Sequence, residues 1–191
     1  MSKLLILGSI AFDQIETPFG KSNSIMGGSA NYIALAAAQF EILAAFVSIV
    51  GDDYPQEYLN LLTERRIDVS GIEIVQGGKT LFWSGKYHND MNQRDTLDTQ
   101  LNVINDFKPV VPEAFRDAEV LLLGNLHPTL QMDVLNQMTQ RPKLVVMDTM
   151  NYWMNHTWDL LMEVIARVDV LTINDEEARQ LTKEYSLVKA A

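Results

Sequence analysis

The sequence predicts an α/β protein that is built on a mostly parallel sheet with helices on both faces, together with a small β segment. Short, continuously apolar runs recur along the chain, and each ends in glycine or in a small polar residue. In the second half of the chain these runs alternate with amphipathic stretches of helical length. Continuous apolar runs are typical of strands that are buried on both faces. Their alternation with helices is typical of parallel crossover units.

The expected strands share an apolar run that stops at a turn residue, and they cover residues 3–10, 42–50, 71–75, 80–87, 120–123, 144–147 and 168–173. The expected helices are rich in alanine or have an apolar face at helical spacing. They cover residues 27–40, 55–62, 128–139, 156–167 and 175–183. The stretch 12–26 is interpreted as a short hairpin, and 88–106 as an exposed loop with an edge strand.

The composition narrows the classes of function. Of the 191 residues, 47% are hydrophobic, which is a normal share for a globular protein, and the net charge is −10. An acidic chain is not attracted to phosphate backbones or anionic lipid, so we expect no nucleic-acid partner and no membrane partner. No apolar stretch approaches the ~18 residues of a membrane span. The absence of cysteine excludes disulfides and thiolate metal sites and is compatible with a cytoplasmic protein.

Polar or glycine residues follow five of the expected strands, namely Gly8–Ser9, Gly51–Asp52, Gly124–Asn125, Asp148 and Asn174. In open parallel sheets, ligands bind outside the carboxyl ends of the strands. The same residue types are also ordinary turn residues. For each of these strand ends, a binding role and a purely structural role therefore both stay open.

The most informative group near the N-terminus is Gly27, Gly28 and Asn31, which open an alanine-rich helix. Two glycines at a helix start let a ligand approach the backbone, and the helix N-terminus offers free N–H donors. An asparagine side chain both donates and accepts, which suits a sugar hydroxyl. Asp13 could accept hydrogen bonds from two neighbouring hydroxyls of a polyol. The structural alternatives are a helix cap with a tight turn and, for Asp13, an exposed turn residue.

Asn174 and Glu177 have the spacing of a capping box, in which an N-cap side chain and a residue three positions later satisfy each other's backbone N–H groups. That structural role explains the spacing. The functional alternative is that Glu177 orders a Mg²⁺-bound water near nucleotide phosphates. Two nucleotide motifs are missing, since the chain has no Walker sequence and no dinucleotide-binding glycine fingerprint. The three histidines lack metal-ligand spacing.

Taken in order, these segments resemble the ribokinase family of PfkB-type carbohydrate kinases. The matching features are the first apolar strand with Asp13, the Gly27–Asn31 segment before its helix, the segment 47–53 and the Asn174–Glu177 segment. The resemblance implies a ribokinase-like α/β fold and ATP-dependent phosphorylation of a hydroxyl on a sugar or sugar-like molecule. It implies ATP and Mg²⁺ as cofactors.

The resemblance also implies roles for individual residues. Asp13, Gly28 and Asn31, with the adjacent Gly27, would bind the substrate hydroxyls. Asn174 and Glu177 match the family's Asn-x-x-Glu motif, which supports Mg²⁺ and phosphate without a direct metal ligand.

Two segments, about 12–26 and 80–104, would form a small β lid over the sugar, which Trp83 and Tyr87 could face. Because family lids often pair, the resemblance also implies a possible homodimer through the lid.

The sequence departs from the family at one motif. Family enzymes carry a later Gly-Ala-Gly-Asp motif that supplies the general base and the anion hole, and it does not occur here. No catalytic base can be named, and we expect it beyond residue 191. Residues 1–191 are therefore interpreted as a truncated ribokinase-like domain whose C-terminal part is missing. Such a fragment would be nearly inactive and would leave one side of its sheet uncovered.

Three alternatives compete with a sugar kinase. A nucleoside kinase of the same fold could stack a base on Phe12, Trp83 or Tyr87. A non-catalytic sugar-binding protein could use the sheet and lid without phosphoryl transfer. A dinucleotide-binding domain is disfavoured by the missing glycine fingerprint.

Overall fold

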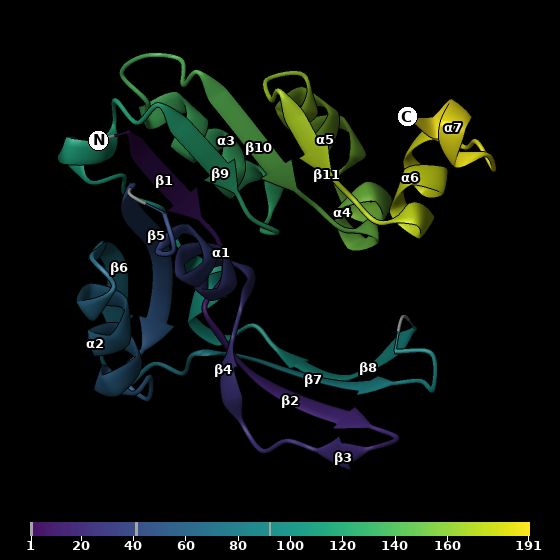
Figure 1. Cartoon of the computed structure of the whole chain (residues 1–191), viewed down its shortest axis with the longest axis horizontal. Helices are drawn as coiled ribbons and strands as arrows, with labels where there is room; N and C mark the ends of the chain where they lie inside the picture. The colour runs from purple at the N-terminus through teal and green to yellow at the C-terminus, as the bar shows by residue number, and fades with distance from the viewer. Residues whose placement is uncertain (1, 41, 92) are drawn as a thin grey trace.

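A six-stranded sheet forms the centre of the protein (Figure 1). The computed structural model describes residues 2–40, 42–91 and 93–191. Every neighbouring pair in this sheet is parallel. The strands, in their order across the sheet, are β11 (Val170–Thr172), β10 (Leu144–Asp148), β9 (Val120–Leu123), β1 (Lys3–Leu7), β5 (Leu43–Gly51) and β6 (Ile67–Val75). The predicted mostly parallel α/β fold is confirmed.

Helices connect these strands and cover them. They are α1 (Ser29–Ala37), α2 (Gln56–Glu64), α3 (Pro128–Gln137), α4 (Asn151–His156), α5 (Trp158–Ile165), α6 (Asp175–Thr182) and α7 (Leu187–Ala190), with two short 3₁₀ segments, η1 (Asn102–Asp106) and η2 (Glu113–Phe115). Within the described ranges, none of these helices combines the length and apolar character needed to cross a membrane.

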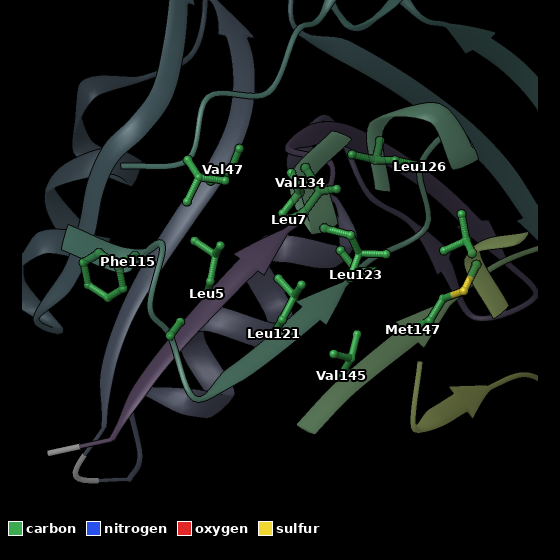
Figure 2. Close-up of a cluster of buried hydrophobic side chains, with 14 of the residues drawn as sticks. Leu5, Leu7, Val47, Phe115, Leu121, Leu123, Leu126, Val134, Val145 and Met147 are labelled. Carbon is green, nitrogen blue, oxygen red and sulfur yellow. The ribbon is translucent and has the colours of Figure 1, made fainter. Parts of the chain in front are cut away.

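Side chains of β1 alternate between two apolar cores, one on each face of the sheet. Leu5 and Leu7 point into the larger core, where residues from β9, β10 and α3 surround them (Figure 2). Residues of α5 belong to the same core. Leu4 and Ile6 point into the second core, which contains Ala30 of α1 and Leu62 of α2. This alternation is the two-residue period of a strand that is buried on both sides. Helices on both faces were predicted and are present.

The face covered by α1 and α2 is less complete at β10 and β11. Leu144 lies in register with Val120, which packs against the core beneath α1 and α2. Leu144 is nevertheless 38% exposed, and Val170 on β11 is 42% exposed. Apolar side chains of the parallel sheet are therefore partly open to solvent on this part of the face.

Several predicted boundaries were wrong. The strand that we expected over 71–75 begins at Ile67, because a bulge in its pairing with β5 lets it extend further back. The helix expected over 156–167 is two helices, α4 and α5, separated at Thr157. Thr157 has a φ of −138° and a ψ of 37°, which lie outside the helical range, and its hydroxyl donates to the Trp153 carbonyl at 3.0 Å. The segment expected as a loop ends in the 3₁₀ turn η1.

A second, smaller sheet projects from the first (Figure 1). It contains β2 (Ala11–Thr17), β3 (Gly20–Lys21), β4 (Ile25–Gly27), β7 (Leu81–Tyr87) and β8 (Arg94–Gln100). These strands lie within or close to the two stretches, 12–26 and 80–104, that we predicted as lid segments. The two stretches meet through parallel pairing of β2 with β7.

A compact hydrogen-bond network joins the two sheets where β5 ends and β7 begins. The Thr80 hydroxyl donates to Asp53 Oδ1 at 2.7 Å and accepts from the Gly51 backbone N–H at 3.0 Å. The Thr80 backbone N–H also donates to Asp53 Oδ1, at 2.9 Å. Thr80 is only 2% exposed, so these polar groups have little access to water as a substitute partner. The network fixes the direction in which the small sheet leaves the large one.

Removal of the Thr80 hydroxyl tests the importance of this junction. Thr80→Val keeps the shape of the side chain and removes the hydroxyl, which leaves the Gly51 N–H without its acceptor. Because an unsatisfied buried polar group costs about 1–3 kcal/mol, we expect the free energy of unfolding in urea to fall by that amount. Asp52→Asn is the control, since Asp52 is exposed and its carboxylate accepts from the Gly77 N–H at 2.9 Å. Equal stability of the two variants would contradict the proposed importance of the junction.

Candidate functional site

The order of strands reverses direction between β1 and β9. From β1 the chain adds β5 and β6 on one side, and then returns to add β9, β10 and β11 on the other. The carboxyl ends of two strands that diverge in this way are the usual binding position in open α/β sheets. Here these ends carry Gly8–Ser9 and Gly124–Asn125. The strand ends that the sequence highlighted are thus adjacent in space.

Asp13 lies in β2, shortly after β1, and the chain folds tightly around its carboxylate. A Cβ atom on Gly27 would lie 2.2 Å from Asp13 Cγ, so only glycine leaves room for the carboxylate there. The Gly28 backbone N–H donates a hydrogen bond to this carboxylate, which lowers its pKa. Partial burial has the larger and opposite effect, so the pKa of Asp13 is raised overall. Asp13 is therefore a partly desolvated carboxylate that retains hydrogen-bonding capacity.

Gly28 directly precedes α1 and has a φ of +89°, a region that residues with side chains rarely adopt. We expected free N–H donors at this helix start, and the structure corrects that expectation. The Ser29 N–H donates to Ser9 Oγ at 3.3 Å, and the Ala30 N–H donates to the Ser9 carbonyl at 3.2 Å. With the Gly28 N–H on Asp13, the first donors of α1 have partners within the chain. The two glycines therefore shape the backbone around Asp13, and the N–H groups at this helix start are used within the chain.

Asn31 follows in α1 and is completely buried. Its amide Nδ2 donates to the Gly27 carbonyl at 2.6 Å and to the Tyr54 hydroxyl at 3.3 Å. Its Oδ1 atom has no partner among the described residues. Asp13, Gly27, Gly28 and Asn31 are thus brought together in one place, and Asn31 holds an unused acceptor there.

The three aromatic residues that we considered for base stacking divide between two faces of the small sheet. Phe12 packs on Tyr54, with ring centroids 5.6 Å apart, in a buried cluster at the root of the sheet. Trp83 is the register partner of Asp13 on the neighbouring parallel strand, so both side chains project from the other face. Tyr87 lies four residues further along β7 and projects from that same face. Phe12 is therefore turned away from Asp13, whereas Trp83 and Tyr87 share its face.

Asp148 ends β10 at the same edge of the large sheet. Burial raises its pKa to about 6, and the negative charge of Glu177 contributes in the same direction. Backbone N–H groups of Thr149 and Asn125 donate to its carboxylate and partly offset that rise. The Asn125 side chain in turn accepts from Trp153 Nε1 at 2.8 Å. The ends of β9 and β10 are therefore linked through Asn125.

The Asn174–Glu177 segment forms the capping box that its spacing predicted. The Glu177 N–H donates to Asn174 Oδ1 at 2.8 Å, and the Asn174 N–H donates to Glu177 Oε2 at 3.0 Å. Glu177 is only 8% exposed and lies within electrostatic range of Asp148. The two carboxylates form a second acidic group, which comes from β10 and α6, whereas the Asp13 group comes from β2, β4 and α1.

Sequence reasoning missed Tyr32 and Trp153 at the site. Tyr32 lies on α1, and its hydroxyl donates to the Met26 carbonyl at 3.4 Å. No motif marks either residue, because each reaches the site through the fold and not through a local pattern. Residues that share a helix face are three or four positions apart, whereas Tyr32 directly follows Asn31, so the helical pattern does not mark Tyr32 as a site residue. Its side chain is 55% exposed.

Known proteins share this fold over the whole chain. A family profile described as pfkB family carbohydrate kinase matches residues 1–190. The cytidine kinase of Thermococcus kodakarensis is 28% identical over an alignment that spans 100% of this chain and 68% of that enzyme.

Two solved structures have the same architecture. The nucleoside kinase of Methanocaldococcus jannaschii, an archaeal member of the ribokinase family, matches 100% of this chain and 67% of its own, with a TM-score of 0.77 and 16% identity. The Burkholderia thailandensis nucleoside kinase in complex with inosine matches 95% of this chain and 64% of its own, with a TM-score of 0.76 and 18% identity.

The chain thus spans about two thirds of the length of these relatives. The profile match covers nearly every residue, and the six-stranded parallel sheet with its projecting second sheet agrees with the solved structures. The chain belongs to the pfkB family of carbohydrate kinases.

Proposed function

We propose that the full-length protein transfers a phosphoryl group from ATP to a hydroxyl of a sugar, either free or as part of a nucleoside. The observation that carries this proposal is the partly buried Asp13 carboxylate, held against Gly27 and Gly28 near the carboxyl end of β1 in a chain of the pfkB family. A carboxylate accepts hydrogen bonds from two neighbouring hydroxyls, which matches a ribose-type diol. The unpartnered Oδ1 of Asn31 would accept from a further hydroxyl.

The second acidic group would serve the phosphate end of the reaction. Mg²⁺ is usually bound by one or two carboxylates together with substrate phosphates, and it neutralises the charge that develops during phosphoryl transfer. Asp148 and Glu177 fit this use, because the two carboxylates lie within electrostatic range of each other. Burial raises the pKa of Asp148, and the negative charge of Glu177 adds to that rise. Asn174 holds Glu177 in place through the capping box. These residues would support Mg²⁺ through ordered water.

The small sheet would act as the lid. It carries Trp83 and Tyr87 on the same face as Asp13, and closing it over the substrate would exclude water that competes with the sugar hydroxyl. We place the general base outside the 191 residues, in the remaining third of the length that the relatives have. We also propose that the protein forms a homodimer through its lids and that it is located in the cytoplasm.

A second candidate is nucleoside phosphorylation as the main activity. The cytidine kinase of Thermococcus kodakarensis, at 28% identity, favours this candidate over a free sugar. A third candidate, a non-catalytic sugar-binding protein, would use the Asp13 group without phosphoryl transfer. Measurements of ADP release and of sugar binding on the same protein distinguish these three candidate functions.

The direct test is ADP release by the full-length protein, with ATP and Mg²⁺, over a panel of pentoses, hexoses, cytidine, inosine and adenosine. We expect at least one compound to stimulate ADP release, and EDTA to abolish it. A preference for nucleosides over every free sugar would select the second candidate. If no compound stimulates ADP release and calorimetry detects sugar binding, the kinase proposal is wrong and the third candidate holds.

Asp13 gives a more local test. Asp13→Asn replaces one acceptor oxygen by an N–H₂ group, and hydrogen bonds to charged groups are worth about 1.5–3 kcal/mol. We therefore expect kcat/KM for the best substrate to fall by roughly ten- to a hundredfold. Asp98→Asn is the matched control, since Asp98 lies on β8 of the same sheet opposite Ser84, which projects from the other face. An equal loss in both variants would argue against hydroxyl binding by Asp13.

The pKa of Asp148 makes stability depend on pH in a defined direction. Its carboxyl has a pKa of about 6 in the folded state against an ordinary 3.8, so the folded state binds the extra proton between these values. Stability contributed by the protonated form is lost as pH rises through 6. Asp148→Asn removes this dependence. We expect its free energy of unfolding relative to wild type to increase between pH 4 and pH 7.

Asp169→Asn is the control of opposite sign. The hydrogen bond from Arg141 lowers the pKa of Asp169, so its contribution is present at neutral pH and is lost as pH falls. The free energy of unfolding of the Asp169→Asn variant, relative to that of wild type, should be lowest near pH 7. An Asp148→Asn difference that does not change with pH would mean that Asp148 is not desolvated.

A further inference from the structure

Gln131 is a polar side chain on an otherwise apolar face of α3, and it is completely buried. Val134 and Leu135 follow it at helical spacing and belong to the larger core. The start of the helix is fixed as well, because His127 Nδ1 accepts from the Thr129 N–H at 3.1 Å. The packing of α3 therefore holds Gln131 in one position, where its amide must find hydrogen-bond partners within the protein.

The amide of Gln131 joins the ends of β9 and β10. Its Nε2 donates to the Gly124 carbonyl at 3.0 Å and to the Asp148 carbonyl at 3.1 Å. The register of the two strands ends with the pair of Leu123 and Met147, one residue before each of these carbonyls. One side chain thus continues the connection between the strands beyond the end of their pairing. We call these two hydrogen bonds the Gln131 clamp.

The acceptor side of the same amide explains why the residue is a glutamine. Both partners of the clamp are carbonyl oxygens, so only the N–H₂ side of the amide can face them. The Oε1 atom of Gln131 has no hydrogen-bond partner among the described residues. A buried polar atom without a partner lowers stability, and an apolar side chain of the same length would avoid that cost. The two carbonyls, and not packing, therefore account for the amide.

Gly124 lies against the part of the site that we assign to the sugar. Its N–H donates to the Leu7 carbonyl, at the end of β1, at 2.7 Å. A Cβ atom on Gly124 would lie 2.8 Å from Ser29 Oγ, and Ser29 opens α1 directly after Gly28. The Gly124 backbone is therefore packed next to the residue whose N–H binds the Asp13 carboxylate.

The other carbonyl of the clamp belongs to Asp148, in the second acidic group. The Asp148 carboxylate accepts from the backbone N–H groups of Asn125 and Thr149. Because Asn125 directly follows Gly124, the clamp holds both the residue that bears this carboxylate and one of its donors. One amide therefore links the segment beside the Asp13 group to the second acidic group.

We propose that Gln131 is a positioning residue for phosphoryl transfer, which keeps the Asp13 group and the second acidic group in a fixed relative arrangement. It acts through the Gly124 and Asp148 carbonyls and not by contact with a substrate. The inference rests on the proposed function, since it concerns the alignment of the two molecules in that reaction. Alignment matters because a misplacement of about 1 Å can reduce a rate by about 10²-fold.

The test compares two glutamines of α3 in the full-length protein. Gln131→Met keeps the length of the side chain and removes both donors of the clamp. Gln137→Met is the matched control, since Gln137 also donates to two backbone carbonyls, those of Pro109 at 2.8 Å and Asp133 at 3.2 Å. Its Oε1 accepts from the Val111 N–H at 2.9 Å. None of these three partners belongs to either group of the site.

Three quantities are measured for each variant: kcat and KM for ATP and for the best substrate of the panel, stability in urea, and amide hydrogen exchange. We expect Gln131→Met to lower kcat by roughly ten- to a hundredfold with little change in either KM, because each group keeps its own binding contacts. Exchange should become faster over residues 124–125 and 148–149. Gln137→Met should lose stability but retain kcat and the wild-type exchange at these positions.

Four results would overturn the inference while leaving the kinase proposal intact. The first is a wild-type kcat in Gln131→Met, and the second is an equal loss of kcat in both variants, which would indicate a general effect of stability. The third is a raised KM with unchanged kcat, and the fourth is unchanged exchange at both strand ends. If no compound in the panel stimulates ADP release by wild type, the proposed function fails together with the inference.

Discussion

The close approach of α1 to the end of β1 is the constraint on which the site depends. A Cβ atom on Gly8 would lie 2.7 Å from Ala30 Cβ, so the helix can pack this tightly only against glycine. Ser9 then accepts the first N–H groups of α1, and Gly28 turns the chain from β4 into the helix. The chain that leaves at Ser9 and returns at Gly28 forms β2 and β4, which pair with each other and leave Asp13 partly buried opposite Ile25. A larger residue at position 8 would push α1 away from β1 and move the residues of the site apart.

The two sheets have different kinds of support. The large sheet is stabilised by apolar cores on both faces, whereas the small sheet is attached through the polar junction at Asp53 and Thr80 and through the Phe12–Tyr54 contact. Polar contacts of this kind are directional and short-ranged, while apolar packing is distributed over many atoms. The orientation of the small sheet therefore depends largely on a few directional contacts at its root, so the loss of one of them would affect it more than the loss of one apolar contact would affect the large sheet.

The sequence was sufficient for the fold class and for most strand positions, because a buried parallel strand is a local apolar pattern, as at Leu4–Leu7. It also singled out Asp13, Gly27, Gly28 and Asn31 as candidates, and the fold brings these four residues together. The resemblance to a known family gave the two lid segments. The features that the sequence could not predict depend on contacts between residues that are distant along the chain. The hydrogen bond from Trp153 to Asn125, the position of Tyr32 and the break of a helix at Thr157 have no signature in the neighbouring residues.

The parallel pairing of β2 with β7 has a consequence for the order in which the protein assembles. Ala11 pairs with Leu81, and the intervening chain contains α1, β5, α2 and β6. Pairings between residues so far apart in sequence form slowly, because loop-closure entropy opposes them until the intervening elements have condensed. The face that carries Asp13 and Trp83 is therefore completed only after β5 and β6 have condensed between the two paired strands. The β1–β9 pairing, which joins Leu4 to Val120, closes a still longer stretch, so a newly made chain can pair β2 with β7 before its central sheet is complete.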